Sequence, residues 1–125
     1  MSKNNLFFRI LFVDDNFQLQ SVLKLGMERY GIDVTTASDG IDALIQYKTH
    51  SGDFSAIVTD NDMPRMNGLE FVSSVREIGF KGRIVVISSL LKKEDLGAYQ
   101  THTISGFFRK PFDIKLLATM LLQGN

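Results

Sequence analysis

Short apolar runs alternate with longer segments of helical periodicity along the 125-residue chain. The first, third and fourth runs are almost continuously apolar, which is typical of strands buried on both faces of a parallel sheet. The runs that we predict to be strands cover Arg9–Val13, Asp33–Ala37, Ser55–Thr59, Arg83–Ser88 and Gly106–Arg109.

The segments between the runs predict five helices. Asn67 and Glu70 have the spacing of a capping box for a helix from Gly68 to about residue 78, and Asp113 is placed to cap the last helix. A further helix is predicted from Lys92 to about residue 102. Apolar stripes at spacings of three and four mark the other helices: Leu19, Val22, Leu23, Gly26, Met27 and Tyr30 in the first, Ile41, Leu44 and Ile45 in the second, and Ile114, Leu117, Ala118, Leu121 and Leu122 in the last.

Five strands alternating with five helices predict an α/β fold, a doubly wound (βα)5 unit with a five-stranded parallel sheet and right-handed crossovers. The sequence contains no internal repeat, low-complexity tract or linker. We therefore expect residues 1–125 to form a single domain, with no second, output domain in this chain.

Composition limits the classes of function. Lys+Arg and Asp+Glu both number 14, so the chain lacks the basic excess expected of a protein that binds nucleic acid directly. No cysteine is present, which excludes disulfides and thiolate metal sites. No apolar stretch approaches the roughly 20 residues of a membrane span, and the N-terminus lacks the pattern of a signal peptide. We expect a cytoplasmic protein that does not associate with membranes.

Polar residues gather at the predicted carboxyl ends of the strands. Asp14 and Asp15 follow the first strand, Asp60 follows the third, and Ser88 and Lys110 end the fourth and fifth. Ligands of open α/β sheets bind beyond these strand ends. Each piece alone is better explained as a turn, a cap or the start of a loop, but their joint position predicts a site.

Carboxylates and an amine at one sheet edge suit a divalent cation and a phosphoryl group. Oxygen ligands are preferred by hard cations such as Mg²⁺, and Lys110 offsets part of the remaining negative charge. A carboxylate can also attack phosphorus to form an aspartyl phosphate. Asp60 is the central candidate for that role, and Ser88 supplies a hydroxyl for the bound group.

The chain resembles response-regulator receiver domains of two-component systems over nearly its whole length. Together, in this order and spacing, the matching segments are highly specific. The resemblance implies a flavodoxin-like sheet with strand order 2-1-3-4-5 and a phosphoprotein that acts in a phosphorelay. The segments that carry it are Ile10–Asn16, Asp60–Gly68, Ile87–Ser89 and Phe107–Phe112.

The resemblance also implies a role for each site residue. Asp60 would accept the phosphoryl group, and Lys110 and Ser88 would contact it. Phe107 would be the aromatic switch that turns inward as Ser88 moves, and the Lys110–Pro111 peptide bond would be cis. Mg²⁺ would be held by Asp15 and Asp60, by Asp14 mostly through water, and by the backbone carbonyl of Asp62.

As a receiver, the chain would take its phosphoryl group from a sensor histidine kinase or a histidine phosphotransfer protein. It would catalyse its own phosphorylation and the hydrolysis of the resulting aspartyl phosphate. It would nevertheless act as a switch and not as a metabolic enzyme. The face made by the fourth helix, fifth strand and fifth helix would then control a downstream effector protein, with Leu116 and Met120 as candidates for that surface. The protein would be a monomer or a phosphorylation-dependent dimer.

Several positions depart from the receiver pattern. Ser89 replaces a smaller residue, Leu90 stands where polar residues often help an attacking water, and Asp62 brings a second charge, so the lifetime of the phosphorylated state is open. Thr103 stands where receivers commonly carry a glycine after the fourth helix. Threonine adopts a left-handed conformation only at a cost, so we expect that helix to end irregularly.

Two other classes of protein compete with the receiver. The segment from Asp60 to Asp62 also resembles the nucleophile motif of haloacid-dehalogenase-type phosphatases, but Pro64 breaks that motif and Asp14 and Asp15 would then have no role. Turnover of a small phosphate ester would favour the phosphatase. A receiver-like binding module that signals without phosphorylation is the second alternative, and the complete acidic set argues against it.

Overall fold

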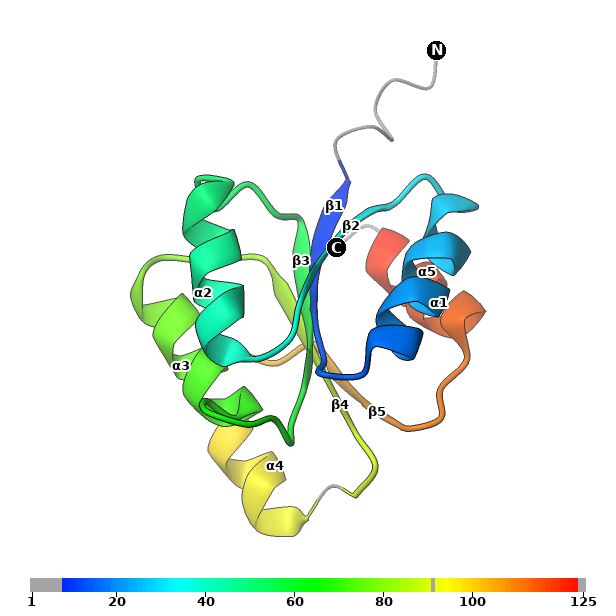
Figure 1. Cartoon of the computed structure of the whole chain (residues 1–125). Helices are drawn as coiled ribbons and strands as arrows, with labels where there is room; N and C mark the ends of the chain where they lie inside the picture. The colour runs from blue at the N-terminus through cyan, green and yellow to red at the C-terminus, as the bar shows by residue number, and fades with distance from the viewer. Residues whose placement is uncertain (1–7, 91, 124–125) are drawn as a thin grey trace.

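The computed structural model describes residues 8–90 and 92–123, which form strands and helices in alternation (Figure 1). The strands are β1 (Arg9–Val13), β2 (Asp33–Ala37), β3 (Ala56–Asp60), β4 (Arg83–Ser88) and β5 (Gly106–Arg109). The helices are α1 (Phe17–Glu28), α2 (Gly40–Thr49), α3 (Gly68–Glu77), α4 (Lys93–Gln100) and α5 (Ile114–Leu122). The paired strands are parallel and lie in the order 2-1-3-4-5, which confirms the predicted fold.

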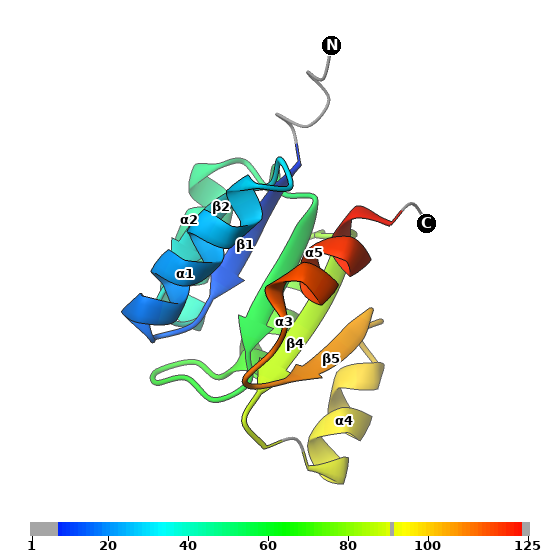
Figure 2. The same cartoon turned by 90° about the vertical axis from the view of Figure 1, so that its right-hand side faces the viewer.

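Helices cover both faces of the sheet (Figures 1 and 2). Helices α2, α3 and α4 pack on one face, and α1 and α5 pack on the other. Neighbouring residues of β1 point to opposite faces, since Leu11 belongs to the first core cluster and Ile10 to the second. Both residues are fully buried, as the nearly continuous apolar strands predicted.

Three apolar stripes differ from their prediction, and in α5 the exception is Leu122, which is 41% exposed. In α2 the buried residues include Ala43 and Tyr47, whereas Ile41 and Ile45 are 38% and 56% exposed. In α1 the predicted stripe is buried at Leu23 and Met27 but not at Val22, which is 55% exposed. Residues of high hydropathy at helical spacing therefore indicated the helices correctly but did not determine which side faces the core.

The end of α4 differs from its prediction in an informative way. Thr103 adopts the left-handed conformation that we expected it to avoid, with φ of 58°. Arg76 of α3 holds this segment, because its guanidinium donates hydrogen bonds to the carbonyls of His102 and Thr103, both at 2.9 Å. The same group also donates to the carbonyls of Phe80 at 2.9 Å and Gly82 at 2.8 Å. Tertiary hydrogen bonds thus maintain a backbone conformation that threonine alone does not favour.

The helices of the described residues all fall short of the apolar length that crossing a membrane requires. The first seven residues, on which the predicted lack of a signal peptide depends, lie outside the described part of the chain.

Candidate functional site

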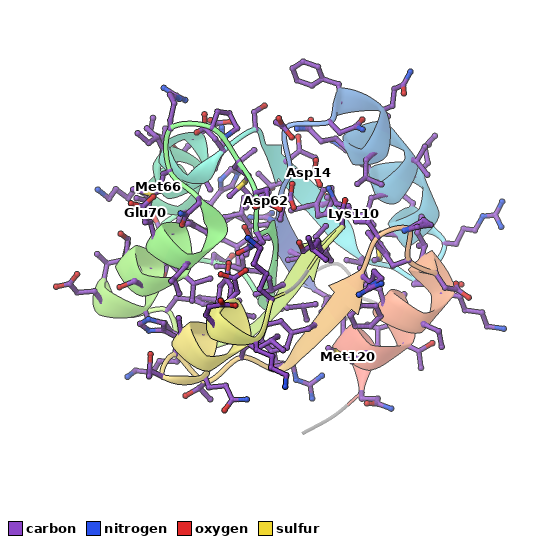
Figure 3. The ribbon with its side chains drawn as sticks, turned by 90° about the horizontal axis from the view of Figure 1, so that it is seen from below. Asp14, Asp62, Met66, Glu70, Lys110 and Met120 are labelled. Carbon is purple, nitrogen blue, oxygen red and sulfur yellow. The ribbon has the colours of Figure 1, made fainter. Side chains whose placement is uncertain are left out.

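The site lies at the carboxyl edge of the sheet, where β1, β3, β4 and β5 deliver their polar residues. The backbone N–H of Asp14 donates to the carbonyl of Ala37 at 3.0 Å, and that of Lys110 donates to the carbonyl of Ser88 at 2.9 Å. Asp60 pairs in register with Ile87 of β4. Because these backbone contacts extend the parallel ladders, the side chains converge as predicted, and Figure 3 shows Asp14 and Lys110 near one another at this edge.

Lys110 bridges two buried carboxylates. Its Nζ lies 2.6 Å from Oδ2 of Asp14 and 3.2 Å from Oδ2 of Asp60. Asp14 is fully buried and Asp60 is 4% exposed, so both charges are shielded from bulk water. Removing Lys110 would leave two buried carboxylates without a compensating cation, which is expensive.

The electrostatics reflect this crowding. Burial first, and then the charge of Asp14, raise the pKa of Asp60 to about 6 from 3.8, although Lys110 opposes the shift. Burial lowers the pKa of Lys110, but its contact with Asp14 and the charge of Asp60 outweigh that effect, so the net shift is upward. Lys110 therefore stays protonated at neutral pH, and Asp60 ionises at the cost of repulsion from Asp14.

The acidic residues fit a hard divalent cation. Oxygen atoms of Asp14, Asp15 and Asp60 lie within 4.8 Å of one another, and Asp15 is exposed to solvent. Oδ2 of Asp14 is buried and accepts no hydrogen bond from the described residues, although Lys110 forms an ion pair with it. A carboxylate-rich edge open to water on one side suits Mg²⁺, which usually keeps several waters.

Asp62 lies beside this cluster without joining it. Its side chain is exposed, and its backbone N–H donates to Oδ1 of Asp60 at 3.4 Å. Figure 3 shows Asp62 at the same edge of the sheet as Asp14. The role of its backbone carbonyl toward a metal stays a prediction.

Ser88 has hydrogen-bond partners other than Asp60 within the described part of the chain. It is fully buried, and its hydroxyl donates to the carbonyl of Leu90 at 3.0 Å and accepts from the N–H of Leu90 at 3.1 Å. Phe107 is half-buried against the core cluster of α2, α3 and α4. The roles of Ser88 and Phe107 in a switch therefore stay predictions. The Lys110–Pro111 peptide bond is cis, as the resemblance implied.

A second ion pair holds the loop after Asp60, and no motif in the sequence pointed to it. Arg65 has φ of 65°, and its Nε donates to Oδ2 of Asp39 at 2.7 Å. Asp39 is 4% exposed and also caps α2 by accepting from the N–H of Asp42 at 2.9 Å. Burial raises the pKa of Asp39, but the hydrogen bond from Arg65 and those from the backbone outweigh it, so the net shift is downward. The loop is thus tied to the start of α2 by a carboxylate that stays ionised.

Comparisons with known proteins agree with this geometry. A family model described as the response regulator receiver domain matches residues 10–122. Two-component response regulator 24 of Arabidopsis thaliana is 28% identical over 115 residues, which is 92% of this chain and 82% of that protein. The chemotaxis protein CheY of Treponema pallidum is 28% identical over 109 residues, covering 86% of this chain and 76% of that protein.

Solved structures give the same result. The chemotaxis protein CheY4 of Vibrio cholerae superposes with a TM-score of 0.84 at 28% identity, covering 92% of this chain and 96% of that chain. A chain from the CheX–CheY–BeF3–Mg complex of Borrelia burgdorferi superposes with a TM-score of 0.83 at 28% identity, covering 92% of this chain and 87% of that chain.

Proposed function

The chain belongs to the response regulator receiver domains, a family of phosphoryl-accepting proteins of two-component signal transduction, and we propose that Asp60 is the residue that accepts the phosphoryl group. The ion pair at 3.2 Å between Asp60 and Lys110 carries this proposal. It places a cation where the charge of a transferred phosphoryl group would lie. Asp60 is also the member of the acidic cluster that ends the central strand, β3.

The acidic cluster is of the kind at which receiver domains bind Mg²⁺, and we assign the ligands to Asp14, Asp15 and Asp60 together with the backbone carbonyl of Asp62. Bound there, Mg²⁺ would neutralise charge that develops on the phosphoryl oxygens. Asp15 is the exposed member of the cluster and would keep one side of the ion open to water. The similar protein from Borrelia forms a complex with Mg and BeF3, which supports the assignment.

The chemical step is an in-line transfer. A carboxylate oxygen of Asp60 attacks phosphorus, and a new P–O bond forms as the P–N bond of a partner phosphohistidine breaks. The electron pair of that bond stays on the imidazole nitrogen, which then binds a proton. Lys110 holds the phosphoryl oxygens as a point charge. We expect a small phosphate donor to serve as well, because the catalytic groups all belong to this chain.

The switch would follow from an exchange of hydrogen-bond partners. Ser88 would leave Leu90 and bond a phosphoryl oxygen, and Phe107 would fill the space that the hydroxyl vacates. The new contacts would change the face made by α4, β5 and α5. Leu116 of α5 is 61% exposed, which suits a partner surface, whereas Met120 is half-buried against the second core cluster.

Receiver domains interact with histidine kinases and downstream effectors, and we propose both as partners here. A hybrid histidine kinase of Dictyostelium discoideum is 30% identical over 116 residues, which is 7% of that protein. The kinase, the effector and the oligomeric state of this chain stay predictions, as do its cytoplasmic location, the lack of direct nucleic-acid binding and the absence of an output domain.

The test is intact mass after incubation with acetyl phosphate, with and without Mg²⁺. We expect one phosphoryl adduct in wild type that requires Mg²⁺ and is labile to alkali. Asp60→Asn should show none, because its amide cannot act as the nucleophile. The matched control is Asp95→Asn on α4, which removes a carboxylate outside the acidic cluster and should keep the adduct.

Three outcomes separate the alternatives. An adduct that persists in Asp60→Asn would place the phosphoryl group on another residue. No adduct and no beryllofluoride binding would favour the binding module that signals without phosphorylation. Steady turnover of a small phosphate ester would favour the phosphatase, which has no support in the family match over residues 10–122.

A further inference from the structure

Tyr99 anchors α4 and was not singled out by the sequence pattern. It is fully buried, and it is the only buried residue of that helix, whose residues 93–100 all belong to the described part of the chain. Among the described residues, Lys92 at the N-cap of α4 makes no side-chain capping hydrogen bond. The position of α4 therefore depends strongly on what the Tyr99 side chain contacts.

The Tyr99 hydroxyl reaches the residue next to the proposed phosphoacceptor. It donates a hydrogen bond of 2.6 Å to Oδ1 of Asn61. The Asn61 amide in turn donates to Oδ1 of Asp62 at 3.4 Å. Burial raises the pKa of Tyr99, and the nearby charges of Asp95, Asp60 and Asp62 add to the shift, so the hydroxyl remains a donor at neutral pH. This donor fixes the orientation of the Asn61 side chain, because the amide oxygen must face Tyr99.

The space around the hydroxyl is closed. A Cβ at Gly68 would lie 2.5 Å from the Tyr99 hydroxyl and 2.5 Å from the backbone oxygen of Asp60. The N–H of Gly68 also donates to the carbonyl of Asn61 at 3.0 Å. The hydroxyl therefore packs against the backbone that carries the site, and only glycine leaves room for it at the start of α3.

The ring of Tyr99 makes a second contact, with the proposed switch residue. Tyr99 and Phe107 meet edge to face, with ring centroids 5.8 Å apart and planes inclined by 70°. One side chain thus contacts both the loop after Asp60 and the aromatic residue of β5. Aromatic pairs in this geometry add to the stability of the packing.

We propose that Tyr99 is a positioning residue that ties α4 to the segment from Asn61 to Asp62 beside the phosphorylation site, an inference that rests on the function proposed above. Through Asn61, the hydroxyl restrains the segment from which Asp62 faces the metal ligands. Through Phe107, the ring makes the place of α4 depend on the state of the switch. Phosphorylation of Asp60 would therefore alter the position of α4 through these two contacts.

The test is a double-mutant cycle on Mg²⁺ affinity, measured by calorimetry. Tyr99→Phe removes the hydroxyl and keeps the ring, and Asn61→Ala removes the acceptor. Each should weaken Mg²⁺ binding about twofold to tenfold, the equivalent of one neutral hydrogen bond. The double variant should bind no more weakly than Asn61→Ala alone, because the hydroxyl then has no partner left to lose.

The matched control is Tyr47→Phe, which removes a tyrosine hydroxyl from the same core cluster at a position beside Gly52. It should leave Mg²⁺ affinity unchanged. A second readout is amide exchange in α4 with Mg²⁺ and beryllofluoride. The change in α4 exchange that these ligands cause in wild type should be about twofold to tenfold smaller in Tyr99→Phe. It should persist in Tyr47→Phe. If the Tyr99 hydroxyl only stabilised the core, Tyr99→Phe and Tyr47→Phe would both lose stability, and the two readouts would not distinguish them.

Three results would overturn the proposal, and they are distinguishable. If wild type binds Mg²⁺ and beryllofluoride and Tyr99→Phe behaves as wild type in both readouts, the positioning role is wrong while the receiver function stands. If wild type binds neither, the proposed phosphorylation site is wrong and the role of Tyr99 falls with it. Additive effects in the double variant would likewise contradict a shared hydrogen bond.

Discussion

Helices α3 and α4 cover the same face of the sheet, yet they are held in different ways. Helix α3 buries Phe71, Val72 and Val75, and it starts at a capping box in which Asn67 and Glu70 satisfy each other's backbone N–H. Helix α4 buries Tyr99 alone, and its described N-cap provides no capping side chain. Several buried side chains and a capping box thus hold α3, whereas α4 depends on one buried side chain, Tyr99, which also contacts Asn61 beside the site.

The ends of α4 also differ from each other. Arg76 of α3 holds the segment that follows α4, with hydrogen bonds to the carbonyls of His102 and Thr103. At the other end, the side chain of Lys92 makes no capping bond within the described residues. Because α4 is held at its C-terminal end and by one buried side chain, it is well placed to change its orientation when the site changes.

Truncating the core of α3 should cost more stability than any other change considered for the two helices. Phe71→Ala should lower the free energy of unfolding by about 3–5 kcal/mol, because a fully buried ring is removed. Leu96→Ala in α4 should cost about 1 kcal/mol, since that side chain is only half-buried. Urea unfolding measures both, with the exposed Ser73→Ala as the control that should change little. Equal costs at the two apolar positions would contradict the contrast between the helices.

A smaller loss of stability is expected where Arg76 of α3 holds the segment that follows α4. Arg76→Ala should lower the free energy of unfolding by about 2–3 kcal/mol, because several carbonyls lose a charged donor. Amide exchange should rise in the segment that includes His102 and Thr103. Arg76→Lys should recover only part of the loss, as an ammonium group cannot match the planar fork of a guanidinium. A free energy of unfolding within about 0.5 kcal/mol of wild type would show that the hydrogen bonds from Arg76 are not needed for stability.

Removing charge from the site should stabilise the whole domain without changing the difference between the two helices. The raised pKa of Asp60, about 6 against 3.8, means that its ionisation opposes folding. That contribution to stability is present below pH 3.8 and is lost as the pH rises through about 6. Without Mg²⁺, Asp60→Asn should therefore be more stable than wild type by about 1 kcal/mol at neutral pH, after allowance for solvent screening.

Thermal unfolding at several pH values checks this sign. The advantage of Asp60→Asn should grow from acidic to neutral pH, and Mg²⁺ should stabilise wild type more than the variant, because only wild type has the full ligand set. Equal Mg²⁺ shifts in the two proteins would contradict the assignment of Asp60 as a ligand. An advantage that shrinks toward neutral pH would contradict the repulsion between Asp60 and Asp14.

Changes at the helix starts should have the mildest consequences. Lys92→Ser gives α4 a capping side chain and should raise the free energy of unfolding by about 0.5–1 kcal/mol. Asn67→Ala removes a cap from α3 and should cost about 1 kcal/mol. Amide exchange in each helix locates the effect. If Lys92→Ser leaves amide exchange in α4 unchanged, the start of that helix is already fixed in wild type.

Strands β1, β3 and β4 were predicted closely because burial on both faces leaves nearly continuous apolar runs. Four of the five strands have the predicted bounds, and β3 begins and ends one residue later than predicted. The convergence of Asp14, Asp60 and Lys110 followed from the same pattern, since parallel strands deliver their carboxyl ends to one edge. Helix caps at Asn67 and Asp113 were also predicted, because capping is local in sequence.

Contacts that depend on tertiary packing were not predictable in this way. The ion pair of Arg65 with Asp39 and the hydrogen bond of Tyr99 with Asn61 join residues far apart in sequence. In α4, residues 93–100, only Tyr99 is buried, so hydrophobic periodicity could not show which residue faces the core. The left-handed Thr103 was also missed, because its conformation is held by another helix.

Whether α4 responds to the state of Asp60 can be measured by amide exchange of α3 and α4 in wild type, with and without Mg²⁺ and beryllofluoride. We expect the phosphoryl mimic to change exchange in residues 93–100 and to leave residues 68–77 nearly unchanged. In Asp60→Asn, exchange in both helices should stay unchanged. An equal response of both helices, or no response of α4 once beryllofluoride is bound, would contradict the proposed link between α4 and Asp60.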